Sequence, residues 1–236
     1  MVHANTLVNS VNVLAIDTSS TSCILGLQVG ELIFDDVRAS GRSHSRDILP
    51  AISSLLEVSG LTFDQLDYIV FGEGPGSFTG LRITVGVVQG LGYGLEIPVV
   101  PVCSLACLAQ SSYQKYGNGY HLVALHARKE EVYFGLYEIE KHIAKPIITE
   151  TVLDVNEIDF ELTGDWIGVG DGWIFREQLE KSLKIDMRRI DTEIQLQPTA
   201  LLNLGAESFK KGDYIDALSA RPKYLRENFP SDDVGK

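Results

Sequence analysis

Short apolar runs separated by glycine and polar turns dominate the start of the chain. Residues 13–16 form one such run, and β-rich runs at 23–29 and 31–37 follow on either side of Gly30. Runs of this length bounded by turn residues are typical of strands. The pattern predicts three strands joined by tight turns, after a polar, unpatterned extension at residues 1–11.

The next segment changes to helical spacing. Five apolar side chains fall on one helical face: Ile48, Leu49, Ile52, Leu55 and Leu56. Residues 62–65 have the spacing of a capping box and predict a short helical turn before a fourth strand at 68–71. A glycine-rich stretch then leads into a helix that reaches Gly94, and a fifth strand follows at 99–102. The predicted order is β-β-β-α-β-α-β.

The second half partly repeats this order, although no repeat is visible in the letters themselves. Helices are predicted at 104–116, 173–182 and 199–211, and strands near 122–125, 132–138 and 166–169. With roughly 150 residues per domain as a guide, 236 residues fit two linked lobes. We expect an N-terminal subdomain at 12–103 and a C-terminal one at 104–236, with the final helix packing back on the first.

Charge and composition narrow the class of partner. The chain has 32 Asp and Glu against 20 Lys and Arg, a net charge of -12, which repels a nucleic-acid backbone. The apolar stretches fall short of the ~20 residues that span a bilayer, and the start of the chain lacks the pattern of a signal peptide. Three cysteines are too few for a disulfide framework. We therefore expect a cytoplasmic protein without direct, tight RNA binding.

Asp17-Thr18-Ser19 follows the first strand and precedes a strand hairpin. Actin-like and sugar-kinase-like proteins hold a nucleotide phosphate and its metal at this position. An ordinary turn is the alternative, because Asp, Thr and Ser also satisfy their own backbone in turns.

The stretch Gly74-Pro75-Gly76-Ser77-Phe78-Thr79-Gly80-Leu81-Arg82 has the glycines that bring backbone N–H groups close to an anion or a partner. It is no P-loop, because Leu81 stands where that motif needs lysine. A tight strand-to-helix connection is the alternative. In the helix that follows, Gly86, Gly90 and Gly94 recur every four residues, although each costs up to ~1 kcal/mol of helix propensity. Such a face lies either on the chain's own sheet or on another subunit.

Several of these segments carry a family resemblance. They are Leu14-Ala15-Ile16-Asp17-Thr18-Ser19, His44-Ser45 with Ile48-Leu49-Pro50, the nine-residue run from Gly74 to Arg82, Ala127-Arg128, Glu131-Val132-Tyr133, Val169-Gly170-Asp171-Gly172 and Tyr224-Leu225-Arg226. Together they resemble the signatures of the TsaB (YeaZ) family over nearly the whole chain. His126 departs from the pattern, because the family has an aspartate before Ala-Arg.

The resemblance implies an α/β protein with an actin-like (ASKHA, ribonuclease H-like) fold of two subdomains, each a mixed sheet flanked by helices. It implies a non-catalytic subunit that binds TsaD in tRNA threonylcarbamoyladenosine biosynthesis, joined by the ATPase TsaE, with tRNA contacted only indirectly and ATP or ADP at the complex interface. Self-association into a homodimer is left open. The expected interface residues are His44, Ile48, Leu49, Ile52, Gly76, Ser77, Phe78, Thr79, Arg82, Gly86 and Gly90. The expected vestigial nucleotide-binding residues are Asp17, Thr18, Ser19, Arg128, Gly170 and Gly172.

A metal site of the TsaD kind is not expected. TsaD has a His-x-x-x-His pair after its fifth strand, and here Ser104 and Leu108 align with those histidines. We expect no metal and no cofactor in the isolated chain. Two other hypotheses stay open, namely an ATP-dependent small-molecule kinase of the same superfamily, and a peptidase, for which Ser77 has no histidine or acidic partner identifiable in the sequence.

Overall fold

The structure is a computed structural model that describes residues 11–39, 44–158 and 161–225. The described chain divides into two units. Unit 1 contains the residues up to Val102 together with 196–222, and unit 2 contains 103–195 together with the residues from Lys223 onward. Residues 196–222, which the sequence analysis assigns to the C-terminal subdomain, therefore pack within unit 1. The expected extension, apart from Val11, lies outside the described residues.

Unit 1 is built on a five-stranded mixed sheet in the order β3-β2-β1-β4-β5. Its strands are β1 (Asn12–Asp17), β2 (Ser22–Val29), β3 (Leu32–Ala39), β4 (Tyr68–Gly74) and β5 (Val99–Cys103). The first three form antiparallel hairpins, whereas β4 runs parallel to β1. The parallel pair places the carboxyl ends of β1 and β4 at the same edge of the sheet.

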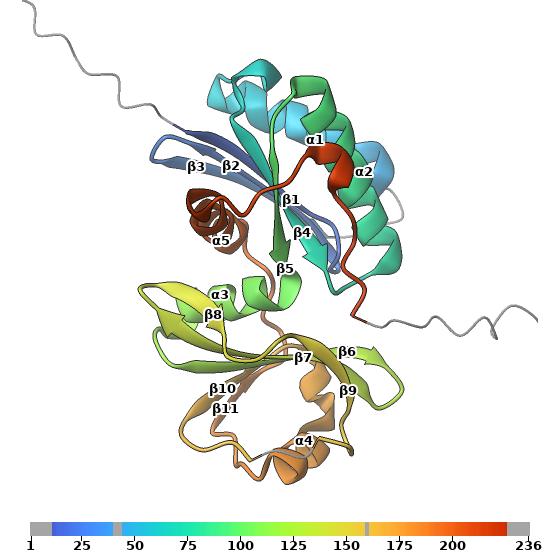
Figure 1. The fold of residues 1–236 in the computed structure, drawn as a ribbon, viewed down its shortest axis with the longest axis vertical. Helices are drawn as coiled ribbons and strands as arrows, with labels where there is room; N and C mark the ends of the chain where they lie inside the picture. Colours follow the sequence, from blue (N-terminus) through green and yellow to red (C-terminus); the bar gives the residue numbers. More distant parts are fainter. Residues whose placement is uncertain (1–10, 40–43, 159–160, 226–236) are drawn as a thin grey trace, which may run out of the picture. The chain divides into compact units, whose positions relative to one another are not determined.

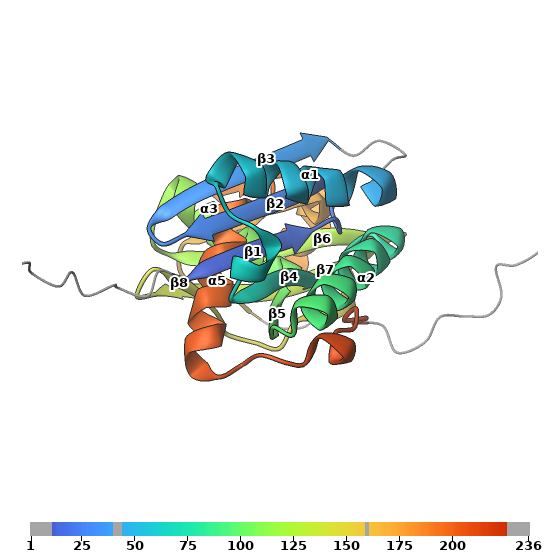
Figure 2. The ribbon, with the colours of Figure 1, turned by 90° about the horizontal axis from the view of Figure 1, so that it is seen from above.

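Helices cover both faces of this sheet (Figure 1). Helices α1 (His44–Ser59) and α2 (Phe78–Leu95) lie on one face, and α5 (Pro198–Lys211) lies on the other. Figure 2 shows α1 along β2 and β3, and α2 on the side of β4. Two short 3-10 helices, η1 (Phe63–Gln65) and η3 (Ala217–Ser219), complete the unit, and η3 packs on α2.

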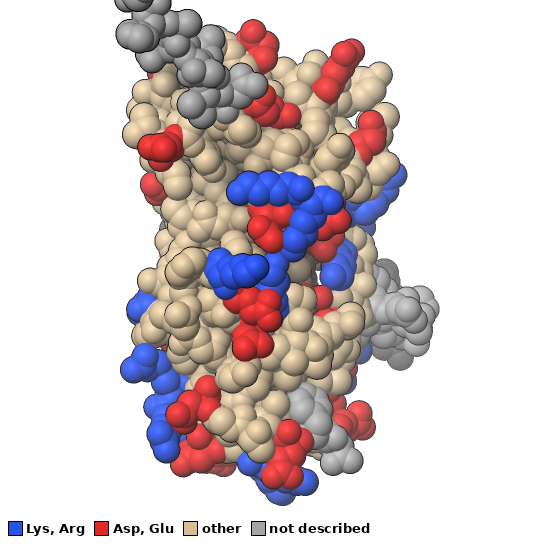
Figure 3. Space-filling view, turned by 60° about the vertical axis from the view of Figure 1, so that its left-hand side comes forward, with Lys and Arg blue, Asp and Glu red and all other residues tan. Residues whose placement is uncertain are grey.

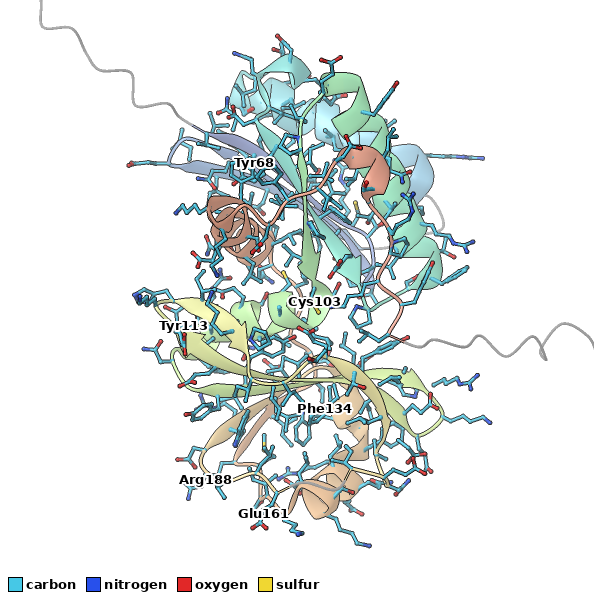
Figure 4. All side chains as sticks on the ribbon, in the orientation of Figure 1. Tyr68, Cys103, Tyr113, Phe134, Glu161 and Arg188 are labelled. Atoms are coloured by element: carbon cyan, nitrogen blue, oxygen red, sulfur yellow. The ribbon has the colours of Figure 1, made fainter. Side chains whose placement is uncertain are left out.

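Alternating apolar side chains of the strands fill the two interfaces. Leu14 and Ile16 face α1 and α2, and both are fully buried. On the opposite face α5 approaches very closely, because a Cβ added at Gly205 would lie 2.3 Å from Val70 Cγ2. Tyr68, labelled in Figure 4, stacks on Phe209 of α5 with ring centroids 4.0 Å apart. These contacts fix α5 on the first sheet.

Unit 2 has a six-stranded sheet with the path β11-β10-β6-β7-β8, on which β9 also pairs with β7. Its elements are α3 (Ser104–Tyr116), β6 (Tyr120–Arg128), β7 (Glu131–Glu140), β8 (Ile143–Pro146), β9 (Thr151–Asp154), β10 (Trp166–Val169), η2 (Asp171–Phe175), α4 (Arg176–Leu183) and β11 (Arg189–Asp191). Helix α3 covers one face, and Trp173, Leu179 and Phe134 fill a core on the other. Phe134 is labelled in Figure 4.

The two sheets have the same topology. In each, a three-stranded meander comes first, a later strand pairs in parallel with its first strand, and one more strand follows on the outer side of that later strand. The second sheet differs by the added strand β9, which pairs with β7. The predicted class, two subdomains each with a mixed sheet flanked by helices, is confirmed. The sequence pattern did not predict β8, β9 and β11, because strands of only three or four residues are too short to show a clear alternation.

Candidate partner-binding surface on helix α2

The glycine-rich loop before α2 lies directly on the Asp17–Ser19 turn. The Ser77 amide donates to the Ser19 carbonyl oxygen at 2.7 Å, and the Thr18 hydroxyl donates to the Gly80 carbonyl oxygen at 2.8 Å. A Cβ added at Gly80 would lie 1.9 Å from Thr18 O, and one at Gly76 would lie 2.6 Å from Ser19 O. Only glycine permits this approach, so the loop's composition is explained by contact within the chain.

The backbone amides of the turn are used internally. Thr18 N donates to Thr84 Oγ1 at 2.9 Å, and Ser19 N donates to Asp17 Oδ1 at 2.6 Å. The Ser19 hydroxyl donates to the same carboxylate oxygen at 2.8 Å. Asp17, Thr18 and Ser19 are all buried. The three residues expected to be vestigial phosphate ligands therefore form the foundation of the loop, and the Thr18 and Ser19 amides are occupied by side chains of the same chain.

The first turn of α2 projects outward from this foundation. Ser77 is the N-cap, and its hydroxyl accepts a hydrogen bond from Gly80 N at 3.3 Å. Phe78 and Thr79 are exposed, and the Arg82 guanidinium lies over the Phe78 ring, 3.8 Å from its centroid. Cation–π stacking of this kind holds both side chains together at the surface. The expected interface residues Ser77, Phe78, Thr79 and Arg82 are thus accessible.

The glycine row of α2 faces away from its own sheet. Gly86, Gly90 and Gly94 are exposed, and a Cβ added at any of them meets no atom within 4 Å. Gly92 shows the opposite environment, because its added Cβ would lie 2.7 Å from Ala217 Cβ of η3 and 2.9 Å from Val99 Cγ1. The alternative in which the row packs on the chain's own sheet is therefore wrong, and Gly92 serves the internal contact instead.

The exposed face of α2 is almost uncharged. This 18-residue helix has a single charged residue, Arg82. Tyr93, near its C-terminal end, is 66% exposed. We call the surface of Phe78, Arg82, Gly86, Gly90 and Tyr93 the α2 strip. A shallow row of glycines between bulky side chains lets a second helix approach closely.

Helix α1 contributes less to this surface than expected. Ile48 and Ile52 are 1% and 0% exposed and lie in the core of unit 1, so their assignment to a partner interface is corrected. Leu49, at 48% exposure, is the apolar residue of the three that reaches the surface. One face of α1 cannot bury all three of these side chains, because Leu49 lies about 100° around the helix from Ile48. His44 begins α1, but its side chain lies outside the described part of the structure.

The candidate residues of unit 2 form connections within that unit. Added Cβ atoms at Gly170 and Gly172 would lie 2.5 Å and 2.8 Å from the Ala124 carbonyl oxygen of β6. Asp171 between them accepts a hydrogen bond from His126 N at 2.8 Å. Arg128 is half-exposed and pairs with Glu131 at 3.6 Å. Gly170 and Gly172 therefore act as a tight strand-to-helix connection.

The positions aligned with the TsaD metal ligands do not assemble a metal site in the part of the chain that the structure describes. No group of three metal-ligating side chains occurs there, and Ser104 and Leu108 are buried. Burial, reinforced by Glu150, raises the pKa of the Cys103 thiol to about 12, so little thiolate exists near neutrality. None of the described helices is both long and apolar enough to cross a membrane.

Sequence reasoning missed three residues of this region. An added Cβ at Gly72 would lie 1.6 Å from Asp17 Oδ2, Thr84 accepts from the Thr18 amide, and Gly92 receives η3. Nothing in the sequence indicated their roles, because Thr84 is an ordinary helix residue by its pattern, and Gly72 and Gly92 are two glycines among many. Their partners lie far away in the sequence, as the separation of 66 positions from Thr18 to Thr84 illustrates.

The paired mixed sheets define the class of this protein, a two-lobed α/β protein of the actin-like (ASKHA, ribonuclease H-like) kind. In unit 1, the Asp17–Ser19 turn is hydrogen-bonded by the chain's own glycine-rich loop and by helix α2.

Comparison with known proteins agrees with this class. The family model for TsaD, tRNA N6-adenosine threonylcarbamoyltransferase, matches residues 38–169. The tRNA threonylcarbamoyladenosine biosynthesis protein TsaB of Escherichia coli is 35% identical over 92% of this chain and 95% of its own length. The Haemophilus influenzae TsaB protein is also 35% identical, over 92% of this chain and 94% of its own.

Two solved structures from Pseudomonas aeruginosa extend the comparison. YeaZ superposes with a TM-score of 0.84 at 32% identity, covering 91% of this chain and all of that one. A protein described as similar to peptidase YeaZ gives a TM-score of 0.86 at 33% identity, covering 92% and 100%. This chain belongs to the TsaB family, and the predicted resemblance is confirmed.

Proposed function

We propose that this chain is the non-catalytic subunit of a complex that makes threonylcarbamoyladenosine in tRNA, and that the α2 strip is where it binds the catalytic subunit TsaD. Membership of the TsaB family supports the pathway, because relatives are named for this biosynthesis. The TsaD family model that matches residues 38–169 supports a structural kinship between the two subunits.

The single observation that carries the binding role is the exposed glycine row. Three glycines in one helix sacrifice helix propensity, and in the isolated chain no contact compensates for them. The row lies on an almost uncharged helix face in a chain with a net charge of -12. A closely packed partner helix would provide the missing contacts.

The other parts of the assembly follow from this role. TsaE would join the pair, ATP or ADP would lie at the complex interface, and tRNA would contact basic surfaces on other subunits. On the face shown in Figure 3, Lys and Arg side chains are interspersed with Asp and Glu instead of forming a basic field. Because its substrate would be tRNA, the complex would act in the cytoplasm. The kinase alternative is disfavoured, because the Asp17–Ser19 amides already have internal partners.

The test introduces a large side chain into the row. Gly90→Leu should leave the melting temperature of the isolated chain within a few degrees of the parent, because the added Cβ meets no atom within 4 Å. It should weaken TsaD binding by about tenfold or more, because overpacking a close helix contact costs ~1–3 kcal/mol. Binding is measured by titration calorimetry or a pull-down with the cognate TsaD.

Asn203→Leu is the matched control. Asn203 is exposed on α5, on the opposite face of the first sheet, so the same side chain is added to another surface helix. It should leave TsaD binding unchanged. A folded Gly90→Leu chain that binds TsaD as tightly as the parent would refute the assignment of the α2 strip.

A further inference from the structure

A closed cluster of hydrogen bonds joins the Asp17–Ser19 turn to the first turns of α2. The Thr18 hydroxyl donates to the Gly80 carbonyl oxygen at 2.8 Å, and Thr84 Oγ1 accepts from the Thr18 amide at 2.9 Å. The two hydroxyl oxygens lie 2.8 Å apart. Because the Thr18 hydrogen points at Gly80 O, the Thr84 hydroxyl donates to Thr18 Oγ1. Each hydroxyl then has a donor and an acceptor.

Because both threonines are buried, losing one of these hydrogen bonds would be costly. Thr18 is 1% exposed and Thr84 is 0% exposed, so water cannot replace a lost partner. Thr84 faces the sheet from the second turn of α2, and Gly86 on the next turn is on the exposed side. The cluster therefore fixes the N-terminal end of α2 to the Asp17–Ser19 turn. Phe78 and Arg82 lie on the surface at this end of the helix.

We propose that Thr18 and Thr84 are positioning residues for the partner surface, and that the phosphate-binding turn of the actin-like fold serves here as a socket for helix α2. Gly72, Gly76 and Gly80 complete the socket, because a Cβ at any of them would overlap Asp17, Ser19 or Thr18. The socket fixes the start of α2, and with it the directions of Phe78 and Arg82. Its effect on binding rests on the function proposed above.

The experiment compares Thr84→Val with Thr84→Ser. Valine has the same shape but leaves the Thr18 amide and hydroxyl short of a partner, whereas serine keeps the hydroxyl. Amide hydrogen exchange is followed by mass spectrometry in residues 77–84 and, as an internal control, in the core strand β2. We expect Thr84→Val to speed exchange in 77–84 by about tenfold and to leave β2 unchanged. Thr84→Ser should behave as the parent does.

Affinity for TsaD is measured on the same three chains. It should fall for Thr84→Val and recover for Thr84→Ser. Equal acceleration in β2 and residues 77–84, or no acceleration in either, would overturn the positioning role. If Thr84→Val does not fold, Thr18→Val, which removes the bond to Gly80, is compared with Thr18→Ser in the same way.

A nucleotide provides an independent check. Because the Thr18 and Ser19 amides are occupied within the chain, adding ATP with Mg²⁺ should not change exchange in residues 17–19. Protection of those amides by ATP would overturn the socket. If the parent chain fails to bind TsaD at all, the proposed function fails, while the exchange comparison still decides whether Thr18 and Thr84 position α2.

Discussion

At the scale of single residues, two glycines less than two turns apart on α2 have opposite surroundings. Gly92 is buried against Ala217 and Val99, whereas Gly86 meets no atom within 4 Å of an added Cβ. Glycine is unfavourable in a helix, so replacing either glycine by alanine gains helix propensity. The difference between the two changes in stability therefore measures the cost of the space lost at Gly92.

Gly92→Ala should therefore destabilise the chain, by about 1–3 kcal/mol, since its Cβ would overlap η3 or force it to move. Gly86→Ala should stabilise it by up to about 1 kcal/mol through helix propensity alone. Urea unfolding of the two variants measures both changes. Equal effects of the two substitutions would contradict the described orientation of α2.

The folded structure disfavours the charged form of the His121 side chain. It is fully buried on β6, with Nδ1 at 2.9 Å from the Ser112 hydroxyl oxygen. Burial lowers its pKa from 6.5 to about 4, because the charged imidazolium loses its hydration. In the unfolded chain the pKa returns to its ordinary value, so the unfolded chain takes up a proton first as the pH falls.

Acidification should therefore weaken unit 2. The contribution of His121 is unchanged above about pH 6.5, and on the order of 3 kcal/mol of stability is lost as the pH falls toward 4. Urea unfolding at several pH values between these limits measures the loss. His121→Asn keeps a polar atom near Ser112 without titrating, so its stability should fall less steeply. Identical slopes for variant and parent would exclude His121 as the cause.

At the scale of elements, the spacing of apolar residues predicts helix α1 correctly but does not show which of its apolar side chains are exposed. The helix spans His44–Ser59, and Ile48, Ile52, Leu55 and Leu56 are buried as the spacing predicts. Leu49 stands at the edge of the apolar face and is half-exposed. A five-residue apolar stripe is wider than the strip that one helix can bury against a sheet.

Ile52→Ala and Leu49→Ala should separate these roles. Ile52→Ala removes a fully buried side chain and should cost about 2–5 kcal/mol of stability. Leu49→Ala should change stability by less than about 0.5 kcal/mol and should weaken TsaD binding if α1 borders the α2 strip. Thermal unfolding and a TsaD titration distinguish them. A stable Ile52→Ala variant would contradict the described core.

At the scale of the whole molecule, the described residues of the two units contain no group of three side chains that could hold a metal ion. The glycine-rich loop packs on the Asp17–Ser19 turn of unit 1, and the Gly170–Gly172 connection of unit 2 packs on its own β6. Both features agree with the non-catalytic role proposed above.

The purified chain should accordingly contain no stoichiometric transition metal and should not hydrolyse ATP on its own. Elemental analysis and a phosphate-release assay measure these properties. One tightly held iron or zinc per chain, or steady ATP turnover that scales with its concentration, would restore independent catalysis as the main hypothesis. A reconstituted complex with TsaD supplies the positive control.

The sequence by itself determined the order of elements in the first lobe, the limits of α3 at Ser104–Tyr116, and the family. Periodicity and turn chemistry are local properties, so they can be detected within a dozen residues. The nine-residue glycine motif likewise marked the start of α2, because its glycines and the capping residue Ser77 are neighbours in the chain.

The tertiary structure alone decided what that motif does. The bonds of Thr18 with Thr84 and the packing of α5 on the first sheet join residues far apart in the chain, and no local pattern encodes such contacts. The same holds for the exposed side of α2, because Gly86 and Gly92 are the same letter in one helix and differ only in what packs beside them. Packing over long sequence separations therefore decided that the Asp17–Ser19 turn, expected to be a vestigial nucleotide site, holds the start of α2.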